Sequence, residues 1–548
     1  MDKLFQWVSA LKDKEVFSNT AMIDTTKYED FAFWWFLRYR LFIDLSMIFE
    51  SKKTHYRRSL GRLIITKLSQ LYLLSVILFA LFSKLFFPKR IKRKKAKKKI
   101  FVTFNTGDWR GFRDIQTGKY LRGHSLFGPI LQSLSTKQDS YEFFSSYPFG
   151  YSFFSFAKLA FDARISQQLG RFSPLESYFT WRSLVEVLRA RNVFMRRFKK
   201  ITKSEKGKRV FNYRGMDLLS QFQTDFEYYF KVYLPLMVQY YKLSLQIFKK
   251  EKPDLVLMEN EYVGFERALI YACHKRRVPS LAQQHGVIHE DHPGYLYTKE
   301  DISTQEYTKH PFCPLASITS VIGPSFKKVL TDVSAYPESK VAISGQPRYD
   351  VFYFTDRIYD KSAFLKRFNL DPKKKIVLLA TQPFPLERLR HEFFTNTLNN
   401  LRSIEGIQIV VKPHPNEAIQ WFTDQLASVK TTVVVLPPFF DTIEAIYASD
   451  VFLSVNSTTI IEALILNKPV VVVNLSKQTE PLPWVEEGAA LGVYEAKSIQ
   501  RTVENALYDE KVRKKLDAKR TDFVHKHLYK IDGKATERVI DLIQKLAK

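Results

Sequence analysis

A chain of 548 residues is too long for a single hydrophobic core, so two or three domains are expected. Its hydrophobic fraction of 45% argues against a disordered protein, and two cysteines, Cys273 and Cys313, are too few for a disulfide framework. The formal net charge of +29 requires an acidic partner, which would be nucleic acid, an anionic membrane face or a phosphorylated substrate.

Residues 1–99 are predicted to form a helical region at the periphery of the protein. Tyr28–Phe49 is rich in aromatic residues that either pack against the next domain or lie at a membrane interface, and the pattern favours neither. The stretch 68–87 is apolar apart from Lys84 and has about the length that a bilayer-spanning helix needs. A buried helix of a soluble protein is the alternative for this stretch.

A block of basic residues follows the apolar segment. Residues 89–99 include nine lysines and arginines in eleven positions. A cationic run beside an apolar helix is typical of attachment to an anionic, cytoplasmic leaflet. We therefore expect a single-pass or monotopic protein at the cytoplasmic face of the cell membrane. Nucleic acid is not expected as a partner, because the block lacks interleaved aromatic residues and any recognisable reading module.

From residue 100 onward, buried strands alternate with helices. A strand over Ile100–Phe104 ends in a turn that contains Asp108, a helix-rich region follows, and two successive strand–helix alternations come after it. Such alternation predicts parallel, doubly wound sheets. We expect an α/β protein with two Rossmann-like domains facing a cleft: residues 100–350, with a helical insertion, and residues 351–548.

The segment LAQQHGVIHEDHPGY, Leu281–Tyr295, contains three histidines after a predicted strand. His285, His289 and His292 are spaced four and three residues apart, which on a helix would place them on one face as metal ligands. The proline and glycines of the segment disfavour a helix, so we predict no metal site. His285 ends the strand, while His289 and His292 are expected to contact an acceptor or to lie at the surface.

Two further motifs follow strands of the second alternation. VVKPHPNE ends a hydrophobic strand in a turn stiffened by two prolines, and SVNSTTIIEAL is a hydroxyl-rich turn that leads into a helix. An ordinary N-cap explains a lone Ser or Thr, but a helix start beyond a parallel strand also offers N–H groups and a positive dipole end to a phosphate. The candidate donor-binding residues are Lys412, His414, Pro415, Asn456, Ser457, Thr458, Thr459 and Glu462, together with Arg348 and Gln382 at other predicted strand ends.

Together these motifs resemble the nucleotide-sugar-binding half of GT-B glycosyltransferases. The similarity is to enzymes of surface-polysaccharide biosynthesis: capsule-polysaccharide transferases, bacterial polysialyl- and sialyltransferases, and CDP-glycerol glycerophosphotransferases. It implies that His414 contacts the donor phosphate or nucleotide, that Ser457–Thr458 hold the diphosphate, and that Glu462 holds the ribose. The segment GQPRYD resembles the start of the second half in these enzymes, and its Arg348 would pair with donor phosphate or form an interdomain salt bridge.

The resemblance also implies a role for the histidine loop. In these families the strand before the cleft often ends in a His-Gly pair, and the histidine is a candidate catalytic base. Gln284, His285 and Gly286 match that pattern, and Gly286 is expected to permit a close approach or an unusual backbone angle. The rival candidates for the base are Asp108, Glu259 and Glu261.

The predicted function is transfer of a sugar, or of a related polyol phosphate, from a CMP-, CDP- or UDP-linked donor to a surface glycan or a lipid-linked acceptor. A helix dipole and basic side chains would neutralise the departing nucleotide, so neither a metal ion nor another cofactor is expected. Closure of the two domains would exclude water and favour transfer over hydrolysis.

Two other functions stay open. The run NLSKQTEPLPWVEEGAALGV resembles the T-E-R-P-E…E-x-G segment of non-hydrolysing UDP-N-acetylglucosamine 2-epimerases, which share this fold. It departs from that segment at Leu482 and Pro483, and no G-T-R-P-E motif follows the first strand. The second alternative is a non-catalytic, polymer-binding scaffold on a degenerate transferase fold, against which the intact donor motifs argue.

Overall fold

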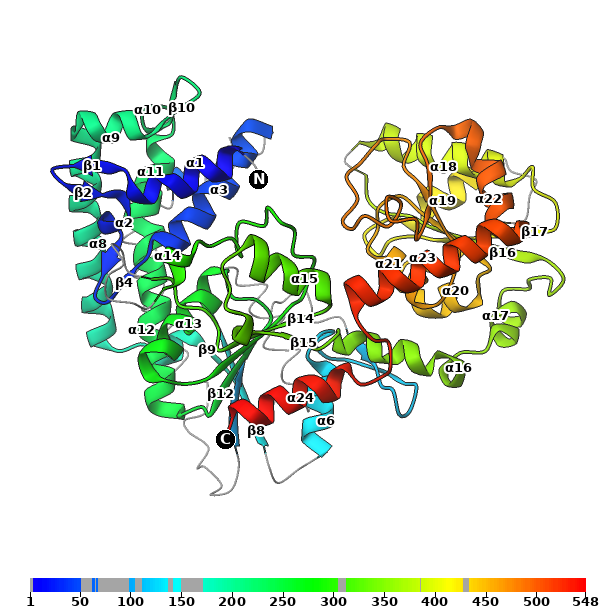
Figure 1. The fold of residues 1–548 in the computed structure, drawn as a ribbon, viewed down its shortest axis with the longest axis horizontal. Coiled ribbons are helices and arrows are strands. Elements are labelled where there is room, and N and C mark those ends of the chain that lie inside the picture. Colours follow the sequence, from blue (N-terminus) through cyan, green and yellow to red (C-terminus); the bar gives the residue numbers. More distant parts are fainter. Residues whose placement is uncertain are drawn as a thin grey trace.

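The computed structural model describes most of the chain, which forms two lobes side by side (Figure 1). The described residues are 3–50, 62–64, 66–67, 98–103, 111–136, 141–148, 171–303, 312–384, 386–426 and 433–548. The predicted apolar segment 68–87, residues 89–97 of the basic block and Asp108 lie outside these ranges. Among the helices within them, none is both long and apolar enough to cross a bilayer.

The first lobe is built on a seven-stranded sheet with the order β15-β14-β13-β12-β5-β8-β9, in which all neighbours are parallel. Its strands are β5 (Lys98–Val102), β8 (Tyr141–Tyr147), β9 (Arg171–Pro174), β12 (Leu255–Met258), β13 (Ser280–Gln283), β14 (Ile318–Val321) and β15 (Val341–Ile343). Runs such as LVLM in β12 are buried throughout, because helices cover both faces of the sheet. The strand order reverses at β5, so a topological switch point lies beside it.

The second lobe is built on a six-stranded parallel sheet with the order β18-β17-β16-β19-β20-β21. Its strands are β16 (Lys375–Ala380), β17 (Ile407–Lys412), β18 (Val433–Val435), β19 (Val451–Ser454), β20 (Val470–Val473) and β21 (Leu491–Val493). Here the order reverses between β16 and β19. The two sheets confirm the predicted parallel, doubly wound architecture with two Rossmann-like lobes, which is consistent with a GT-B fold.

Helices flank both sheets (Figure 1). In the first lobe these are α6 (Gly128–Thr136), α13 (Gly264–Arg276), α14 (Lys299–Ile302) and α15 (Pro324–Lys328). In the second lobe they are α17 (Lys361–Arg367), α18 (Glu387–Leu401), α19 (Ile419–Leu426), α20 (Thr442–Ala448), α21 (Thr459–Ile465), α22 (Ile499–Tyr508) and α23 (Glu510–Leu528).

A further helical layer lies on the side of the first lobe that faces away from the second lobe (Figure 1). It contains α1 (Lys3–Ala10), α3 (Trp34–Glu50), α8 (Trp181–Lys203), α9 (Glu205–Val210), α11 (Gln223–Tyr228), α12 (Leu234–Glu251) and the short hairpin β10–β11 (Asn212–Tyr213, Met216–Asp217). Trp34 and Trp35 are buried, and the ring of Trp35 lies 6.0 Å from that of Tyr297. These two tryptophans of the aromatic stretch therefore pack inside the protein and do not face a membrane.

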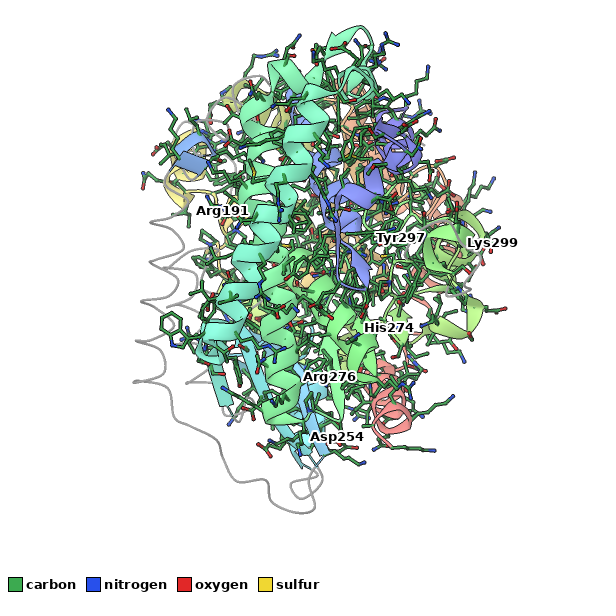
Figure 2. The ribbon with its side chains drawn as sticks, turned by 90° about the vertical axis from the view of Figure 1, so that its left-hand side faces the viewer. Arg191, Asp254, His274, Arg276, Tyr297 and Lys299 are labelled. Carbon is green, nitrogen blue, oxygen red and sulfur yellow. The ribbon has the colours of Figure 1, made fainter. Side chains whose placement is uncertain are left out.

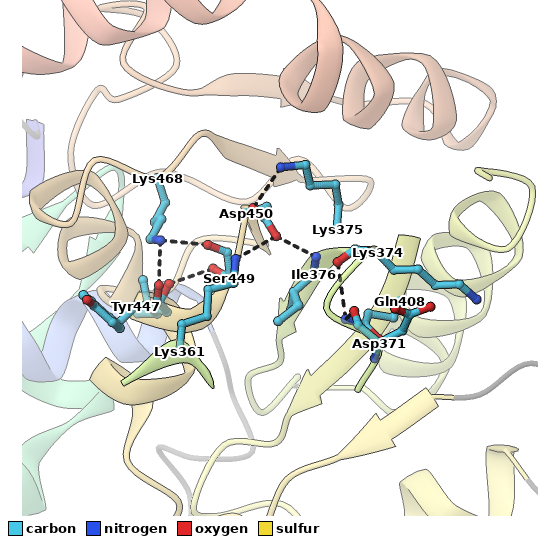
Figure 3. A network of polar contacts seen from close by, with 11 residues as sticks. Lys361, Asp371, Lys374, Lys375, Ile376, Gln408, Tyr447, Ser449, Asp450 and Lys468 are labelled. Carbon is cyan, nitrogen blue, oxygen red and sulfur yellow. Dashed lines mark hydrogen bonds and ion pairs between the residues drawn. The ribbon is translucent and has the colours of Figure 1, made fainter. Parts of the chain in front are cut away.

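Asp450 organises the amino edge of the second sheet (Figure 3). It accepts the backbone N–H of Ile376 at 2.8 Å and lies 3.2 Å from Nζ of Lys361 and 3.4 Å from Nζ of Lys375. Burial alone would raise the pKa of Asp450, but this N–H and the two lysines hold it below its ordinary value. Asp450 therefore stabilises the edge opposite to the strand ends at which ligands bind in such sheets.

Two segments connect the lobes. The first contains the 3-10 helix η8 (Pro347–Phe354) and α16 (Thr355–Ile358), and the second follows α23. Asp350 of the first segment accepts the backbone N–H groups of Ala535 and Thr536 at 2.8 and 2.7 Å, where the last helix begins. Gly345 has φ of +79°, and a Cβ there would lie 3.1 Å from that of Ala535, so glycine lets the two segments approach.

The last helix, α24 (Ala535–Leu546), returns to the first lobe. Val539, Ile540 and Ile543 are buried in one cluster with apolar side chains of β5, β12 and α6. By its place in the chain this helix falls within the predicted second domain, 351–548, yet it packs against the first sheet (Figure 1). The core of the first lobe is thus completed by the end of the chain.

We predict that Ile543→Ala lowers the free energy of unfolding by about 2–5 kcal/mol, because it removes buried methyl groups and leaves a cavity. Chemical denaturation would measure this change. Lys545→Ala, on the exposed side of the same helix, is the matched control and should change stability by less than about 0.5 kcal/mol. Equal effects of the two substitutions would contradict the packing of α24.

Candidate active site

His285 follows β13 at the carboxyl edge of the first sheet. Its Nδ1 lies 3.0 Å from the backbone carbonyl of Glu259, which follows the neighbouring strand β12. A carbonyl oxygen only accepts hydrogen bonds, so Nδ1 carries the proton of the neutral imidazole and Nε2 carries the lone pair. The half-buried ring therefore has a fixed tautomer that suits a general base acting through Nε2.

The carboxylate of Glu259 faces a second histidine. Glu259 is 1% exposed, and its Oε2 lies 3.3 Å from Nε2 of His124, which is 0% exposed. Nδ1 of His124 accepts the backbone N–H of Phe127 at 3.1 Å, so the proton of the neutral ring lies on Nε2, the nitrogen nearest to Glu259. This buried pair lies at the end of β12, where the backbone carbonyl of Glu259 orients His285. Glu259 therefore contacts His285 as a positioning residue through its main chain.

Two other predicted residues at this edge, Glu261 and Gln284, form hydrogen bonds with neighbouring segments of the first lobe. Glu261 accepts the backbone N–H of Ala316 at 3.2 Å and the hydroxyl of Thr319 at 2.8 Å, and burial raises its pKa. Gln284 donates to the carbonyl of Gly286 at 2.7 Å and accepts a backbone N–H after β14 at 2.8 Å. Gln284 thus fastens the start of the histidine loop to the end of β14, whereas Glu261 links the segment after β12 to the start of β14.

The other predicted residues of the histidine loop differ in their exposure and in their neighbours. A Cβ on Gly286 would meet open space and its φ is not positive, so this glycine has neither the unusual backbone angle nor a close protein neighbour. His289 is exposed, whereas His292 is half-buried beside Tyr262, with ring centroids 4.9 Å apart, and burial lowers its pKa to about 4. No group of metal-ligating side chains gathers among the residues that the structure describes.

Glu266 is a further buried carboxyl, in the first turn of α13 directly after β12. Burial and the nearby charge of Glu259 raise the pKa of Glu266 to about 8. At neutral pH its carboxyl group is therefore protonated. The sequence pattern did not single out this residue, because enclosure and a neighbouring carboxylate appear only in the folded chain.

We predict that Glu266→Gln stabilises the protein increasingly above pH 4.5. The folded state keeps the Glu266 proton to about pH 8, whereas the ordinary pKa is 4.5, so the free energy of unfolding falls between these values as pH rises. The glutamine variant lacks this loss and should be more stable by on the order of 4 kcal/mol at pH 8. Unfolding curves at pH 5, 6.5 and 8 would measure it, with the exposed Glu537→Gln as control. A constant difference across this range would refute the assignment.

In the second lobe, Lys412 ends β17 with its ammonium turned into the KPHP turn. Its Nζ donates to the carbonyls of Pro413 at 2.8 Å and Pro438 at 2.7 Å. Burial lowers the pKa of Lys412 to about 8, although the charges of Asp441 and Glu462, among others, oppose that shift. The Lys412 ammonium therefore holds the KPHP turn in place.

His414 is the half-buried residue at the centre of this turn. Its backbone N–H donates to Glu417 at 3.0 Å, and Glu417 also accepts the hydroxyl of Thr381 at 2.5 Å. Nδ1 of His414 accepts the N–H of Asn416 at 3.1 Å, so the neutral ring carries its proton on Nε2 as a donor. Pro415, next in the turn, is exposed.

Three amide side chains meet at the carboxyl ends of β16, β19 and β20. Nε2 of Gln382 donates to Oδ1 of Asn456 at 2.6 Å, and Nδ2 of Asn456 donates to Oε1 of Gln478 at 2.9 Å. Asn474 holds the loop of Gln478 in place through two hydrogen bonds of 2.7 Å. The structure thus brings the predicted Gln382 and Asn456 together, and it adds Gln478, which the sequence analysis did not name as a site residue.

The hydroxyl-rich turn Ser457–Thr459 begins α21. Oγ of Ser457 accepts the N–H of Thr459 at 3.3 Å and its hydroxyl at 2.9 Å, while Thr458 occupies the N-cap position without a side-chain cap. Glu462, one turn further on, is close enough to Lys412 for their charges to interact. The KPHP turn and the Ser457–Thr459 turn therefore lie together at one edge of the second sheet.

An ion pair joins the two lobes beside this edge. Arg113, in the hairpin β6–β7 (Phe112–Arg113, Tyr120–Leu121) of the first lobe, pairs with Asp441, the N-cap of α20 in the second. Tyr359, from the connecting segment, donates its hydroxyl to Asp441 at 2.8 Å, and its ring centroid lies 4.9 Å from the Arg113 guanidinium. The predicted Arg348 donates to the hydroxyl of its neighbour Tyr349 at 3.1 Å.

Comparisons with known proteins find one family model and a set of solved structures. The model for UDP-N-acetylglucosamine 2-epimerase matches residues 305–544, which is less than half of the chain. Similar structures include UDP-GlcNAc 2-epimerase from Neisseria meningitidis bound to UDP-GlcNAc (14% identity, 82% of this chain and 100% of that chain, TM-score 0.48). A second example is UDP-GlcNAc 2-epimerase from Methanocaldococcus jannaschii (14% identity, 82% of this chain and 99% of that chain, TM-score 0.46). A third is the wall teichoic acid polymerase TagF soaked with CDPG (12% identity, 90% of this chain and 98% of that chain, TM-score 0.44). Curated protein sequences give no match.

Proposed function

We propose that the protein is an enzyme that takes a sugar, or a polyol phosphate, from a nucleotide-activated donor and transfers it to a hydroxyl of a glycan or lipid-linked acceptor. The observation that carries this proposal is the orientation of His285. Its Nδ1–H is held by the Glu259 carbonyl, so Nε2 is the nitrogen that can take a proton. The site lies near a topological switch point of a parallel sheet, where ligands of such folds bind.

In the proposed sugar transfer, the acceptor hydroxyl attacks the anomeric carbon of the donor. Nε2 of His285 takes the hydroxyl proton as the new C–O bond forms. The bond between the anomeric carbon and the nucleotide diphosphate breaks, and its electron pair leaves with the diphosphate. Glu259 and His124 contribute by keeping the His285 ring in position.

The donor is proposed to bind at the carboxyl edge of the second sheet. The Ser457–Thr459 turn supplies hydroxyl and backbone N–H groups for phosphates. The amides of Gln382, Asn456 and Gln478 supply donors and acceptors suited to a base edge or to sugar hydroxyls. The positive charge near this turn would stabilise the departing nucleotide without a metal ion, so EDTA should leave turnover unchanged.

His285→Gln should lower the rate of nucleotide release from the active donor at least about 100-fold, because general-base catalysis is lost. The dissociation constant for the nucleotide should not change, since the donor contacts lie in the other lobe. Release would be followed over a panel of CMP-, CDP- and UDP-linked donors with glycan acceptors. His289→Gln, at an exposed position of the same loop, is the matched control. A fully active glutamine variant would rule out His285 as the base.

The double variant His414→Ala with Ser457→Ala should weaken nucleotide binding at least about tenfold, because it removes one polar contact from each donor motif. Calorimetry, or the rise in melting temperature with added CDP or UDP, would measure the loss. Unchanged nucleotide binding in a folded double variant would favour a non-catalytic, polymer-binding scaffold instead.

A second candidate function is epimerisation of UDP-N-acetylglucosamine, favoured by the family-model match over residues 305–544. The resembling run 474–493 forms the loop after β20 and the strand β21, and in the loop Trp484 is buried and Glu480 accepts the N–H of Val485 at 3.4 Å. Incubation with UDP-N-acetylglucosamine alone separates the two proposals. Conversion to a second UDP-sugar without an acceptor would favour the epimerase, whereas acceptor-dependent release of the nucleotide would favour transfer.

A further inference from the structure

Helix α8 presents a continuous basic face on the outside of the first lobe. The seven positions that recur at helical spacing along this face are all exposed: Arg182, Val185, Arg189, Asn192, Arg196, Lys199 and Lys203. Five of the seven are basic and none is acidic. At about 1.5 Å per residue, the 23-residue helix carries this face over roughly 35 Å.

The opposite face of α8 fixes the orientation of the helix. Leu184, Val187, Phe194, Phe198 and Ile201 recur at helical spacing and are buried in the core of the lobe. A capping box between Thr180 and Ser183 closes the first turn. Because the buried face is apolar and the helix start is capped, the basic face is held outward in the folded protein.

Charge on this surface is strongly one-sided. Residues 181–209 contain eleven lysines and arginines and two glutamates. One glutamate, Glu186, is turned toward α12 and lies 2.6 Å from Nζ of Lys242, and the other, Glu205, pairs with Lys208 at 2.7 Å. The hairpin β10–β11 continues the surface with the exposed Arg214. This surface therefore attracts an anionic partner.

The shape of the surface favours a flat partner. Figure 1 shows α8 on the side of the first lobe that faces away from the second, and Figure 2 looks onto that side, where Arg191 marks the helix. At one end of the basic face Trp181 is 73% exposed, and Val185, one turn on, is 44% exposed. An exposed tryptophan beside a basic helical face is the composition of helices that lie in a membrane interface.

We propose that the exposed face of α8, from Trp181 to Lys203, docks the protein on an anionic lipid bilayer. The arginines and lysines would contact lipid phosphates, and Trp181 would enter the headgroup region. This inference goes beyond the proposed transfer reaction and does not depend on it, because it rests on the charge and exposure of α8 alone. Docking through α8 would also bring the enzyme to a lipid-linked acceptor.

The test is binding of the full-length protein to vesicles of phosphatidylcholine with 30% phosphatidylglycerol, compared with phosphatidylcholine alone. The variant Arg182→Glu, Arg189→Glu, Arg196→Glu should bind the anionic vesicles at least about tenfold more weakly, since each reversed charge is repelled by the surface. Trp181→Ala should also weaken binding. The matched control Lys511→Glu, Lys514→Glu, Lys515→Glu makes the same charge change at exposed positions of α23 and should bind as the wild type does.

Each outcome decides the proposal. Docking through α8 is supported if the α8 variant loses more vesicle binding than the α23 control. The neutral variant with Arg→Gln at positions 182, 189 and 196 should then bind the vesicles more tightly than the Arg→Glu variant but more weakly than the wild type. Equal losses would mean that overall charge alone governs binding and would overturn the proposal. Unchanged vesicle binding together with lost binding to dextran sulfate would assign the face to an anionic polymer instead. Melting temperatures verify that the variants are folded.

Discussion

The hydrogen bond between Nδ1 of His285 and the carbonyl of Glu259 is the constraint on which the account of the active site depends. Parallel pairing of β12 with β13 sets these two strand ends side by side, so a backbone carbonyl of one strand selects the tautomer of a histidine on the next. The buried contact between Glu259 and His124 lies at the same strand end. A main-chain acceptor cannot change its protonation state, and it therefore orients the imidazole over a wide range of pH.

The carboxyl edge of the second sheet carries a different set of side chains from that of the first. This edge gathers amides, hydroxyls and the ammonium of Lys412, which suit a polar ligand of mixed donors and acceptors. The Arg113–Asp441 ion pair and Tyr359 reach this edge from the first lobe and from the connecting segment. Asp441 interacts electrostatically with Lys412, so the contact between the lobes and the charge of the KPHP turn are coupled. Movement of one lobe against the other would therefore alter the electrostatic field at the KPHP turn.

The sequence predicts most strands of the two sheets, because strands such as β12 and β20 are short apolar runs buried throughout, and an apolar run reports such burial directly. Strands β8 and β9 were missed, because their sequences YEFFSSY and RFSP mix polar with apolar residues. The sequence also brings Gln382, Asn456 and the KPHP turn to one edge, since parallel strands share the direction of their ends. His124, Gln478 and Asp441 were missed because their contacts join segments far apart in the chain, and no local pattern records such contacts. The position of α24 on the first lobe was missed for the same reason. The roles of Asp108 and of the apolar segment 68–87 stay predictions.

The most direct measurement is a crystal structure of the protein with CDP or UDP bound. The account predicts that the phosphates contact the Ser457–Thr459 turn and that their free end faces Nε2 of His285 across a shared crevice. A nucleotide bound elsewhere, or an imidazole turned away from that crevice, would contradict the account.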